Sequence, residues 1–348
     1  MRLSELTTLR LGGTAERYVE ASTEEEIVEV VAEGDPLLIM AGGSNLVVAD
    51  EGFAGTVLRI ATRGVMRDGD TLEVASGEAW DPLVASCVSD GLAGVECLAG
   101  IPGSVGATPI QNVGAYGQEV AETIVGVRVL DRMRGTVEEL PPQACRFTYR
   151  SSAFKREPGR WVVLAVRFAL GASELSAPIR YTELARALDV ELGDRAPLAE
   201  VREAVLALRR RKGMVLDPSD RDTFSAGSFF TNPILDADAW ATLQARVADR
   251  LGPDVNPPSW PEADAHVKTS AAWLIERTGF HRGHGDPKGI AISTKHTLAL
   301  TNRGAGTTAQ LVALAREIAG SVREAFGVEL VPEPVFVGHE WKPVSPSR

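Results

Sequence analysis

The part of the sequence best suited to bind a ligand is a glycine-rich stretch at residues 100–117, GIPGSVGATPIQNVGAYG. Its five glycines allow positive φ angles or a backbone approach that a Cβ would block, while Pro102 and Pro109 stiffen the turns. A loop of this kind can present backbone N–H groups at a fixed curvature, which suits the cradle of a pyrophosphate. A tightly packed structural loop in a large domain is the alternative interpretation.

A second glycine-rich turn, Gly-Gly-Ser-Asn at 42–45, follows an apolar run at 37–40 that predicts a strand. This turn would offer N–H groups, a hydroxyl and a carboxamide to phosphate or ribose oxygens. Neither loop has the GxGxxG or GxxxxGK[ST] spacing, so the sequence predicts neither a Rossmann nor a P-loop nucleotide site. Two such loops in one chain nevertheless favour a phosphate-containing ligand.

An arginine that could clamp a carboxylate or a phosphate lies in CRFTYRSSAF at 145–154, just before a predicted strand at 161–170. Arg146, Tyr149 and Arg150 stand close together in this segment. A guanidinium held among aromatic rings and hydroxyls can bind an anion bidentately. An arginine that reaches solvent from the edge of a strand is the alternative.

A serine in an aromatic setting is a candidate proton donor. Ser228 lies in AGSFFTNP, within a strand expected at 227–235, and alternation along that strand would place Ser228 and Phe230 on one face. A hydroxyl in a dry pocket can donate a proton if another group restores it. A half-buried structural serine is the alternative, and the absence of G-x-S-x-G argues against a hydrolase nucleophile.

One acid and one histidine also stand in unusual surroundings. Glu333 lies between two prolines in LVPEPVFVG, where it either faces solvent from an edge strand or occupies a site whose desolvation would raise its pKa. His296 lies inside an expected strand at 289–302 and could line a pocket. No HExxH or comparable pairing is present, so the sequence predicts no metal site; the other histidines are His266, His281, His284 and His339.

Length and charge restrict the classes of function open to the chain. Its 348 residues allow two or three domains, and 44% hydrophobic with 24% charged residues is typical of globular proteins. The net charge of −11 argues against nucleic acid and anionic membranes as general partners. An anionic small molecule is compatible if local cations and backbone N–H groups override the overall field.

Cysteine use and hydropathy indicate a reducing compartment. Cys87, Cys97 and Cys145 show no CxxC or other metal-ligand spacing and have apolar neighbours, so we expect buried free thiols. No apolar stretch approaches the ~20 residues of a membrane span. The N-terminal sequence lacks the apolar core of a signal peptide. We therefore expect a cytoplasmic protein.

Short β-like runs separated by glycine, with helical patterns at 24–34 and 81–91, predict an α+β region in the first half of the chain. A helix at 196–213 carries basic residues in its last turn, where they complement the helix dipole. The remainder has an α/β texture with a tail that frays after Gly338. There we expect helices at 236–252, 268–280 and 307–327, strands at 227–235, 289–302 and 334–338, and a proline-rich loop at 251–264.

Taken together, these segments resemble the UDP-N-acetylenolpyruvoylglucosamine reductase (MurB) family, flavoenzymes of peptidoglycan precursor synthesis. The resemblance extends over nearly the whole chain and follows the order of the family's motifs. Seven such motifs in sequence are far more specific than any one of them. They are TTLRLGGTAE, MAGGSNLVV, the 100–117 loop, FTYRSSAFK, AGSFFTNP, AAWLIERTGF and EPVFVG.

The resemblance implies an α+β fold with a two-part FAD-binding unit of the vanillyl-alcohol-oxidase (PCMH) type and a C-terminal α/β substrate-binding domain. The expected parts are a first FAD-binding subdomain at 1–62, with which the tail at 330–348 packs, a second at 63–200, and the substrate-binding domain at 201–329. The segment IRYTELARAL at 179–188 matches the tyrosine-bearing, substrate-capping segment of one subtype of the family.

The resemblance also implies an oxidoreductase that binds FAD non-covalently and uses NADPH as the hydride donor. Hydride would pass through flavin N5 to the β-carbon of the enolpyruvyl group, and a proton would be added at the α-carbon to give UDP-N-acetylmuramate. The implied FAD-binding residues lie in the two glycine loops. They are Ala41, Gly42, Gly43, Ser44, Asn45, Leu46, Gly100, Ile101, Pro102, Gly103, Ser104, Gly106, Ala107, Thr108, Gln111, Asn112, Gly114, Ala115 and Tyr116.

Three residues match the catalytic residues of the family. Arg150 would stabilise the charge that develops on the substrate, Glu333 would assist on the same side, and Ser228 would donate the proton. The chain departs from the family pattern at Ala107, where many relatives have glycine, and at Pro334-Val335 after the glutamate; Lys212 is nearest to the family lysine before the serine motif. The implied substrate contacts are Tyr149, Tyr181 for the UDP-sugar diphosphate, Asn232 and His296.

Two other functions are compatible with the same scaffold. One is an FAD-dependent oxidase, although residues 36–117 contain no histidine to which a covalent flavin could be attached. The other is a flavin- or UDP-sugar-binding protein that has lost catalysis, which would be expected to lack one of Arg150, Ser228 or Glu333. The expected partners are the UDP-sugar and NADPH, without nucleic acid or membrane.

Overall fold

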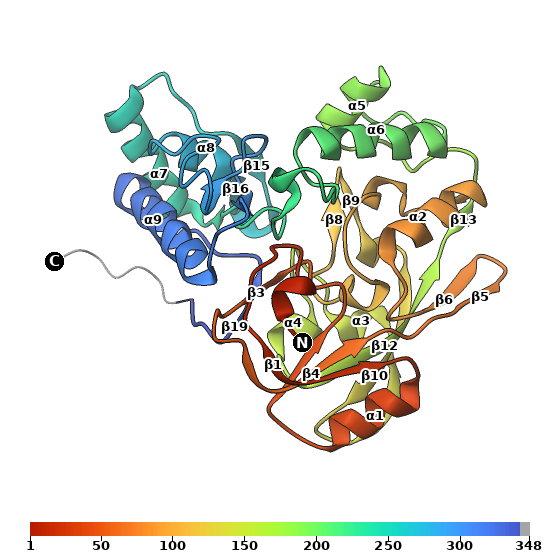
Figure 1. Cartoon of the computed structure of the whole chain (residues 1–348). Coiled ribbons are helices and arrows are strands. Elements are labelled where there is room, and N and C mark those ends of the chain that lie inside the picture. The colour runs from red at the N-terminus through yellow and green to blue at the C-terminus, as the bar shows by residue number, and fades with distance from the viewer. Residues whose placement is uncertain (342–348) are drawn as a thin grey trace. The chain divides into compact units, whose positions relative to one another are not determined.

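The computed structural model describes residues 1–341 and divides the chain into two compact units (Figure 1). The first unit comprises Met1, Ala15–Gly43 and Phe53–Leu216. The second comprises Arg2–Thr14, Ser44–Gly52 and the described residues from Asp217 to Trp341. The expected parts at 1–62, 63–200 and 201–329 stay a prediction, and the part of the expected frayed tail at 342–348 lies outside the described residues.

The first unit contains a three-stranded parallel sheet in the order β1-β4-β2. Its strands are β1 (Ala15–Ala21), β2 (Leu37–Met40) and β4 (Phe53–Ile60). Helix α1 (Glu24–Ala32) begins at a capping box, in which the Thr23 and Glu26 side chains each accept the other's backbone N–H. Its apolar face packs in a core with Leu58. The predicted strand at 37–40 and helix from Glu24 are therefore confirmed.

The same unit holds a five-stranded antiparallel sheet in the order β11-β10-β12-β6-β5. Trp80 and Phe168 lie at the centre of its core, with ring centroids 6.0 Å apart. The strands are β5 (Val65–Asp68), β6 (Thr71–Ala75), β10 (Ile124–Asp131), β11 (Thr136–Leu140) and β12 (Trp161–Ala169).

Helices and short strands complete this unit. The helices are α2 (Trp80–Ser89), α3 (Pro142–Cys145), α4 (Ala153–Arg156), α5 (Thr182–Leu188) and α6 (Leu198–Arg211). Two short pairs are β7 (Leu92–Ala93) with β13 (Gly171–Ala172) and β8 (Gly114–Ala115) with β9 (Gln118–Glu119).

The second unit is built around α9 (Thr308–Phe326), which packs against α7 (Ala237–Leu251) and α8 (Ala271–Glu276) (Figure 1). Leu311, Ala315, Ile318 and Val322 recur at helical spacing along α9 and are fully buried. Three small sheets lie in this unit: β14 (Ile234–Leu235), β16 (Val267–Thr269) and β15 (Ser259–Pro261); β17 (Ile290–Ile292) with β18 (Leu300–Asn302); and β19 (Val335–Val337) with β3 (Leu46–Val48).

Short 3₁₀ turns occur in both units. They span Leu3–Glu5, Glu96–Leu98, Val105–Ala107, Val120–Glu122, Arg221–Thr223 and Ala263–Ala265.

The strand predicted over 227–235 is wrong except at Ile234–Leu235. Phe229 and Phe230 are both only 1% exposed, so the residues of this segment do not alternate between two faces. The reason is that the Phe229 backbone bonds to two different segments: its N–H donates to the Leu298 carbonyl and its carbonyl accepts from the Glu333 N–H. The conformation of this segment is therefore set by hydrogen bonds to two separate segments and not by pairing within a sheet.

Three other expectations need correction in the second unit. The segment 289–302 is a hairpin rather than one strand, because the Ser293 side chain accepts backbone N–H groups and turns the chain after Ile292. The helix expected at 268–280 is limited to Ala271–Glu276, since Ser270 caps it and the preceding residues form β16. The proline-rich loop at 251–264 contains the short strand β15.

The three cysteines are free and buried, as the sequence predicted. Burial raises the pKa of the Cys87 and Cys145 thiols to about 11 and raises that of Cys97 still further. The thiolate is the reactive form of cysteine, so burial both shields these thiols and favours their less reactive protonated form.

We expect Ile318→Ala to destabilise the second unit by roughly 2–5 kcal/mol, because the change removes a fully buried side chain from α9 and leaves a cavity. Urea unfolding followed by far-UV circular dichroism would measure the shift. Glu317→Ala, on the exposed face of the same helix, is the matched control and should change stability by less than about 0.5 kcal/mol. Equal effects of the two variants would show that Ile318 does not pack in the core of this unit.

We also expect all three thiols to resist Ellman's reagent at pH 8 in the folded protein, because they are buried and remain protonated. In guanidinium chloride all three should react, and absorbance at 412 nm (the ordinary thionitrobenzoate signal) would count them. Rapid reaction of one thiol before unfolding would show that its burial is wrong.

Candidate active site

The two glycine loops meet in the first unit. A Cβ added to Gly42 would lie 2.8 Å from the Gly103 Cα, closer than real Cβ contacts occur. The backbone at Gly103 is held in turn by the Trp80 N–H, which donates to its carbonyl at 3.1 Å. Loops that are distant in sequence are thus joined through backbone atoms, with no side chain between them.

The longer loop is also fastened to the end of β6. The Gly106 N–H donates to the Ser76 carbonyl at 2.9 Å, and a Cβ on Gly106 would lie 2.4 Å from the Ser76 Cβ. Beside this contact the Ser104 hydroxyl is buried, and within residues 1–341 it has no hydrogen-bond partner. An orphaned hydroxyl beside a Cβ-free cradle suits a polar ligand such as a pyrophosphate or a ribose.

Other predicted residues of this loop shape it from within. Asn112 is 1% exposed, and its side-chain amide donates to Glu119 and the Thr148 carbonyl and accepts from the Ala121 N–H. Thr108 donates its hydroxyl to the Val105 carbonyl at 2.8 Å. The side chains of both residues therefore support the loop.

Arg150 lies beside the C-terminal half of the same loop. Its Nη2 donates to the Gly114 carbonyl at 2.6 Å, and its guanidinium carbon lies 5.4 Å from the centre of the Tyr149 ring. The backbone at Arg150 has a φ of +52°, an uncommon conformation for a residue with a side chain. Such a conformation persists only where the surroundings impose it, and it is frequent at functional sites.

The segment that carries Tyr181 is anchored in the first unit by ring and ion-pair contacts. The rings of Tyr181 and Tyr116 meet edge to face with centroids 5.4 Å apart. Lys212 lies 5.6 Å from the centre of the Tyr116 ring and donates to Glu183 at 2.5 Å. Because Tyr181 is 42% exposed, it is accessible to a ligand.

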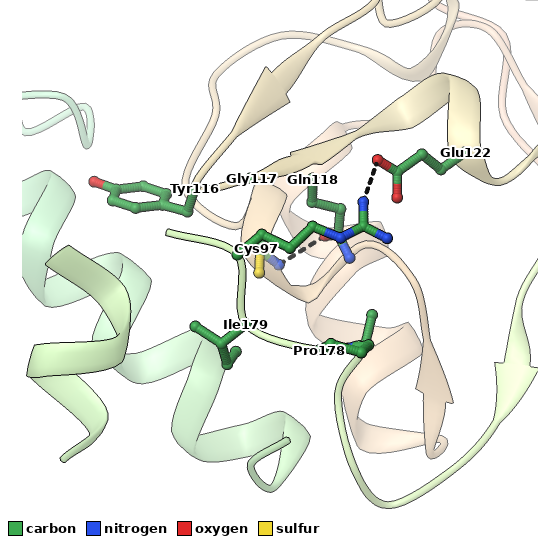
Figure 2. A pocket seen from close by; sticks show the side chains of 9 residues that line it. Cys97, Tyr116, Gly117, Gln118, Glu122, Pro178 and Ile179 are labelled. Atoms are coloured by element: carbon green, nitrogen blue, oxygen red, sulfur yellow. Dashed lines mark hydrogen bonds and ion pairs between the residues drawn. The ribbon is translucent and has the colours of Figure 1, made fainter. Parts of the chain in front are cut away.

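A small pocket lies under this segment (Figure 2). Arg180 and Glu122 form an ion pair of 3.1 Å across it, and the Gln118 side chain accepts from the Cys97 N–H at 2.9 Å. Figure 2 shows Pro178 and Ile179 lining the opposite wall. Ile179 and Arg180 are among its lining residues, so this pocket lies where the segment contacts the Gly117–Glu122 region.

Arg209 is a candidate site residue that sequence reasoning missed. The basic last turn of α6 is confirmed, and Arg210 and Arg211 are exposed, but Arg209 is only 8% exposed. Its Nη2 donates to the Met214 carbonyl at 2.9 Å, while its Nε has no partner among the described residues. A Cβ on Gly100 would lie 3.4 Å from that Nε.

Burial lowers the pKa of Arg209, and the nearby Arg150 charge acts in the same direction. A buried cation with an unpaired N–H next to a glycine loop suits an anionic ligand. The sequence did offer one indication of this burial, because Arg209 continues the buried face of the helix formed by Val201, Val205 and Leu208.

In the second unit the backbone of Phe229 brings Ser228, His296 and Glu333 into one neighbourhood. The Phe229 N–H donates to the Leu298 carbonyl at 2.7 Å, in the loop that contains His296, and the Glu333 N–H donates to the Phe229 carbonyl at 2.8 Å. The Ser228 Oγ lies 3.4 Å from the His296 Nε2. Segments predicted separately from the sequence are therefore adjacent here.

Asn232 and Asn45 support this neighbourhood. The Asn232 side-chain carbonyl accepts from the Ala271 N–H, the first of helix α8, at 3.1 Å. Asn45 donates its side-chain amide to the Glu333 carbonyl at 3.4 Å, and its own carbonyl accepts from the Val335 N–H at 2.9 Å. The second glycine turn thus reaches the segment that carries Glu333.

Among residues 1–341 no three His, Cys, Asp or Glu side chains are grouped so that they could hold a metal ion. Over the same residues, no helix combines the length and apolar character needed to cross a membrane.

Two family models match the chain. One, described as the C-terminal domain of UDP-N-acetylenolpyruvoylglucosamine reductase, matches residues 217–337. The other, described as an FAD binding domain, matches residues 15–141 and so includes both glycine loops. The first match begins where the long C-terminal segment of the second unit begins.

Named relatives are similar over almost the whole chain. UDP-N-acetylenolpyruvoylglucosamine reductase of Streptomyces coelicolor is 60% identical over 341 residues, covering 97% of this chain and 89% of the relative. The enzyme of the same name from Thermobifida fusca is 56% identical, covering 97% and 96%. A crystal structure of UDP-N-acetylenolpyruvylglucosamine reductase from Thermus caldophilus aligns with a TM-score of 0.66 at 25% identity, covering 97% of each chain.

Proposed function

The chain belongs to the family of UDP-N-acetylenolpyruvoylglucosamine reductases, and on that premise we propose how its own residues carry out the reaction. It is an oxidoreductase acting on a CH–CH group, and it reduces the enolpyruvyl group of UDP-N-acetylenolpyruvoylglucosamine to give UDP-N-acetylmuramate for peptidoglycan synthesis. The observation that carries this function is 60% identity over 97% of the chain. The predicted family and α+β fold are confirmed.

FAD and NADPH are the redox partners of the enzyme. FAD, when bound, supplies the transfer of a hydride from NADPH to the β-carbon of the vinyl group. We propose that backbone N–H groups of the loops at 41–46 and 100–116 bind the pyrophosphate of FAD. The orphaned Ser104 hydroxyl and the Cβ-free approach of Gly42 to Gly103 support this assignment. Binding is non-covalent in this proposal.

Arg150 stabilises the negative charge that develops on the substrate. Addition of hydride at the β-carbon leaves charge on the α-carbon and the adjoining carboxylate, and a fixed guanidinium lowers the energy of that state. Its bond to the Gly114 carbonyl and its contact with Tyr149 hold the side chain in position before substrate binds. Because the Tyr149 ring contacts the Arg150 guanidinium, we assign Tyr149 to the substrate site as well.

Ser228 donates the proton that completes the reaction at the α-carbon. A serine hydroxyl is a weak acid, so donation requires a very basic acceptor and a pocket with little water. The buried rings of Phe229 and Phe230 next to Ser228 provide an apolar setting. Glu333, whose backbone is tied to Phe229, assists on the same side of the substrate.

The remaining polar residues are proposed to bind the anionic substrate and NADPH. Tyr181 contacts the diphosphate of the UDP-sugar, and Lys212 and Arg209 add positive charge in the same unit. Asn232 and His296 contact substrate or NADPH. We place the reaction in the cytoplasm, where a reducing environment keeps the buried thiols free.

We expect Gly42→Ala to weaken FAD binding at least about tenfold, because the added methyl group would press on the backbone at Gly103 and open the cradle. Titration of apoprotein with FAD, followed by flavin fluorescence, measures the affinity. Gly171→Ala is the matched control, since nothing lies within 4 Å of a Cβ at that position. Unchanged affinity in Gly42→Ala would remove the cradle from the FAD site.

The reaction itself is tested by anaerobic stopped-flow absorbance. NADPH should bleach the flavin, and the enolpyruvyl-UDP-sugar should then reoxidise it. If the UDP-sugar fails to reoxidise the reduced enzyme, the proposed function is wrong.

In the same assay we expect Ser228→Ala to leave reduction by NADPH intact and to slow reoxidation by substrate at least ~100-fold, the usual effect of losing a positioned proton donor. Ser219→Ala, an exposed serine of the same unit, is the control. Normal reoxidation in Ser228→Ala would exclude the serine as the donor.

A further inference from the structure

The proton donated by Ser228 must be replaced before the next turnover, and His296 is a side chain suited to replace it. The His296 Nε2 lies 3.4 Å from the Ser228 Oγ. This distance is long for a hydrogen bond, as catalytic contacts often are before substrate binds. Histidine is also the side chain that ordinarily gains and loses a proton near neutral pH.

The surroundings of His296 hold its backbone in place. The loop between β17 and β18 is closed by the Ser293 N–H, which donates to the Ala299 carbonyl at 2.8 Å, and the Ser293 hydroxyl accepts from the His296 N–H at 3.3 Å. The Phe229 N–H then ties the serine segment to this loop through the Leu298 carbonyl at 2.7 Å. Backbone bonds therefore set the separation of Ser228 and His296 from both sides.

His296 is also able to exchange protons with water. It is half-buried, and the neighbouring Thr294 is exposed. The ring thus connects a serine next to buried phenylalanines with the solvent.

We propose that His296 is a positioning residue that orients the Ser228 hydroxyl and returns a proton to it in each catalytic cycle. This inference rests on the proposed function. As the Oγ–H bond breaks and the C–H bond forms at the α-carbon of the substrate, the imidazolium Nε2–H bond breaks and its proton moves to Oγ. The neutral imidazole then takes up a proton from water. No additional oxidant or reductant is needed, since the hydride comes from the established reaction.

The charged groups around this pair have their own partners. Lys295, next to His296, is paired with Asp220. Burial acts to raise the pKa of the Asp222 carboxyl, but its hydrogen bonds with Thr294 and the charge of Arg303 outweigh burial and lower that pKa. Glu276 accepts the Thr297 hydroxyl at 2.6 Å on the other side of the loop. Glu333 lies on the segment tied to the Phe229 carbonyl and is a competing source of the proton.

The test uses full-length holoenzyme whose flavin has been reduced chemically under anaerobic conditions, so that contacts of His296 with NADPH play no part. Reoxidation by the enolpyruvyl-UDP-sugar is followed in wild type, His296→Gln and His296→Leu over the range from pH 6 to pH 9. Glutamine can still donate a hydrogen bond to Oγ but cannot deliver a proton. His281→Gln, an exposed histidine of the same unit, is the matched control.

In wild type and His281→Gln we expect the rate to fall as pH rises and the imidazolium loses its proton. His296→Gln and His296→Leu should be slower at neutral pH by at least about tenfold and should lack this decline, with glutamine the faster of the two because it still orients the hydroxyl. A decline that survives in both variants would assign the proton to another group and overturn the inference. Wild-type rates in His296→Gln would do the same.

A second readout does not depend on catalysis. In ¹⁵N-labelled protein without substrate, Ser228→Ala should shift the Nε2 resonance of His296 and leave that of His281 in place. An unshifted His296 resonance would show that the two groups do not interact. The two proposals fail separately: normal reoxidation in Ser228→Ala contradicts the role of the serine, whereas slow Ser228→Ala with normal His296 variants contradicts only the role of the histidine.

Discussion

The contact between the backbone at Gly42 and that at Gly103 is the constraint on which the first unit depends. No side chain fits between these two loops, since a Cβ would lie 2.8 Å from the opposite Cα. The contact brings the end of β2 to the long glycine loop, and the Trp80 N–H and β6 hold that loop in turn. A close backbone approach of this kind is what a pyrophosphate cradle needs, because main-chain N–H groups must reach the ligand without obstruction.

Charge is organised locally in this unit rather than over the whole chain. The net charge is −11, but Arg150, Arg209 and Lys212 lie close to the glycine loop or the tyrosine pair beside it. Burial removes water from the Arg209 guanidinium, which disfavours the charged form and lowers its pKa. A buried cation with an unpaired N–H is stabilised by an anionic ligand. We therefore infer that these local cations let an anionic substrate and a flavin dinucleotide bind to a protein whose net charge is negative.

The second unit uses main-chain hydrogen bonds to position reactive side chains. Phe229 bonds through its N–H to the loop of His296 and through its carbonyl to Glu333, while its ring is buried. The serine between the glycine and this phenylalanine thereby gains fixed neighbours on two sides. The sequence singled out Ser228, Glu333 and His296 individually, by their unusual surroundings and by resemblance. It contained no pattern that placed Ser228 next to His296.

Local patterns in the sequence determined the long helices, the strands predicted at 37–40 and 161–170 and the identity of the glycine loops. Helix α1 illustrates why: its apolar spacing, its cap and its closing glycine all lie within a dozen or so residues. Tertiary structure alone decided that the tail pairs through β19 with β3 in particular, that the 227–233 segment is not a strand and that Arg209 is buried. The physical reason is that these features depend on hydrogen-bond partners and packing surfaces supplied by distant parts of the chain, whose positions no local periodicity records.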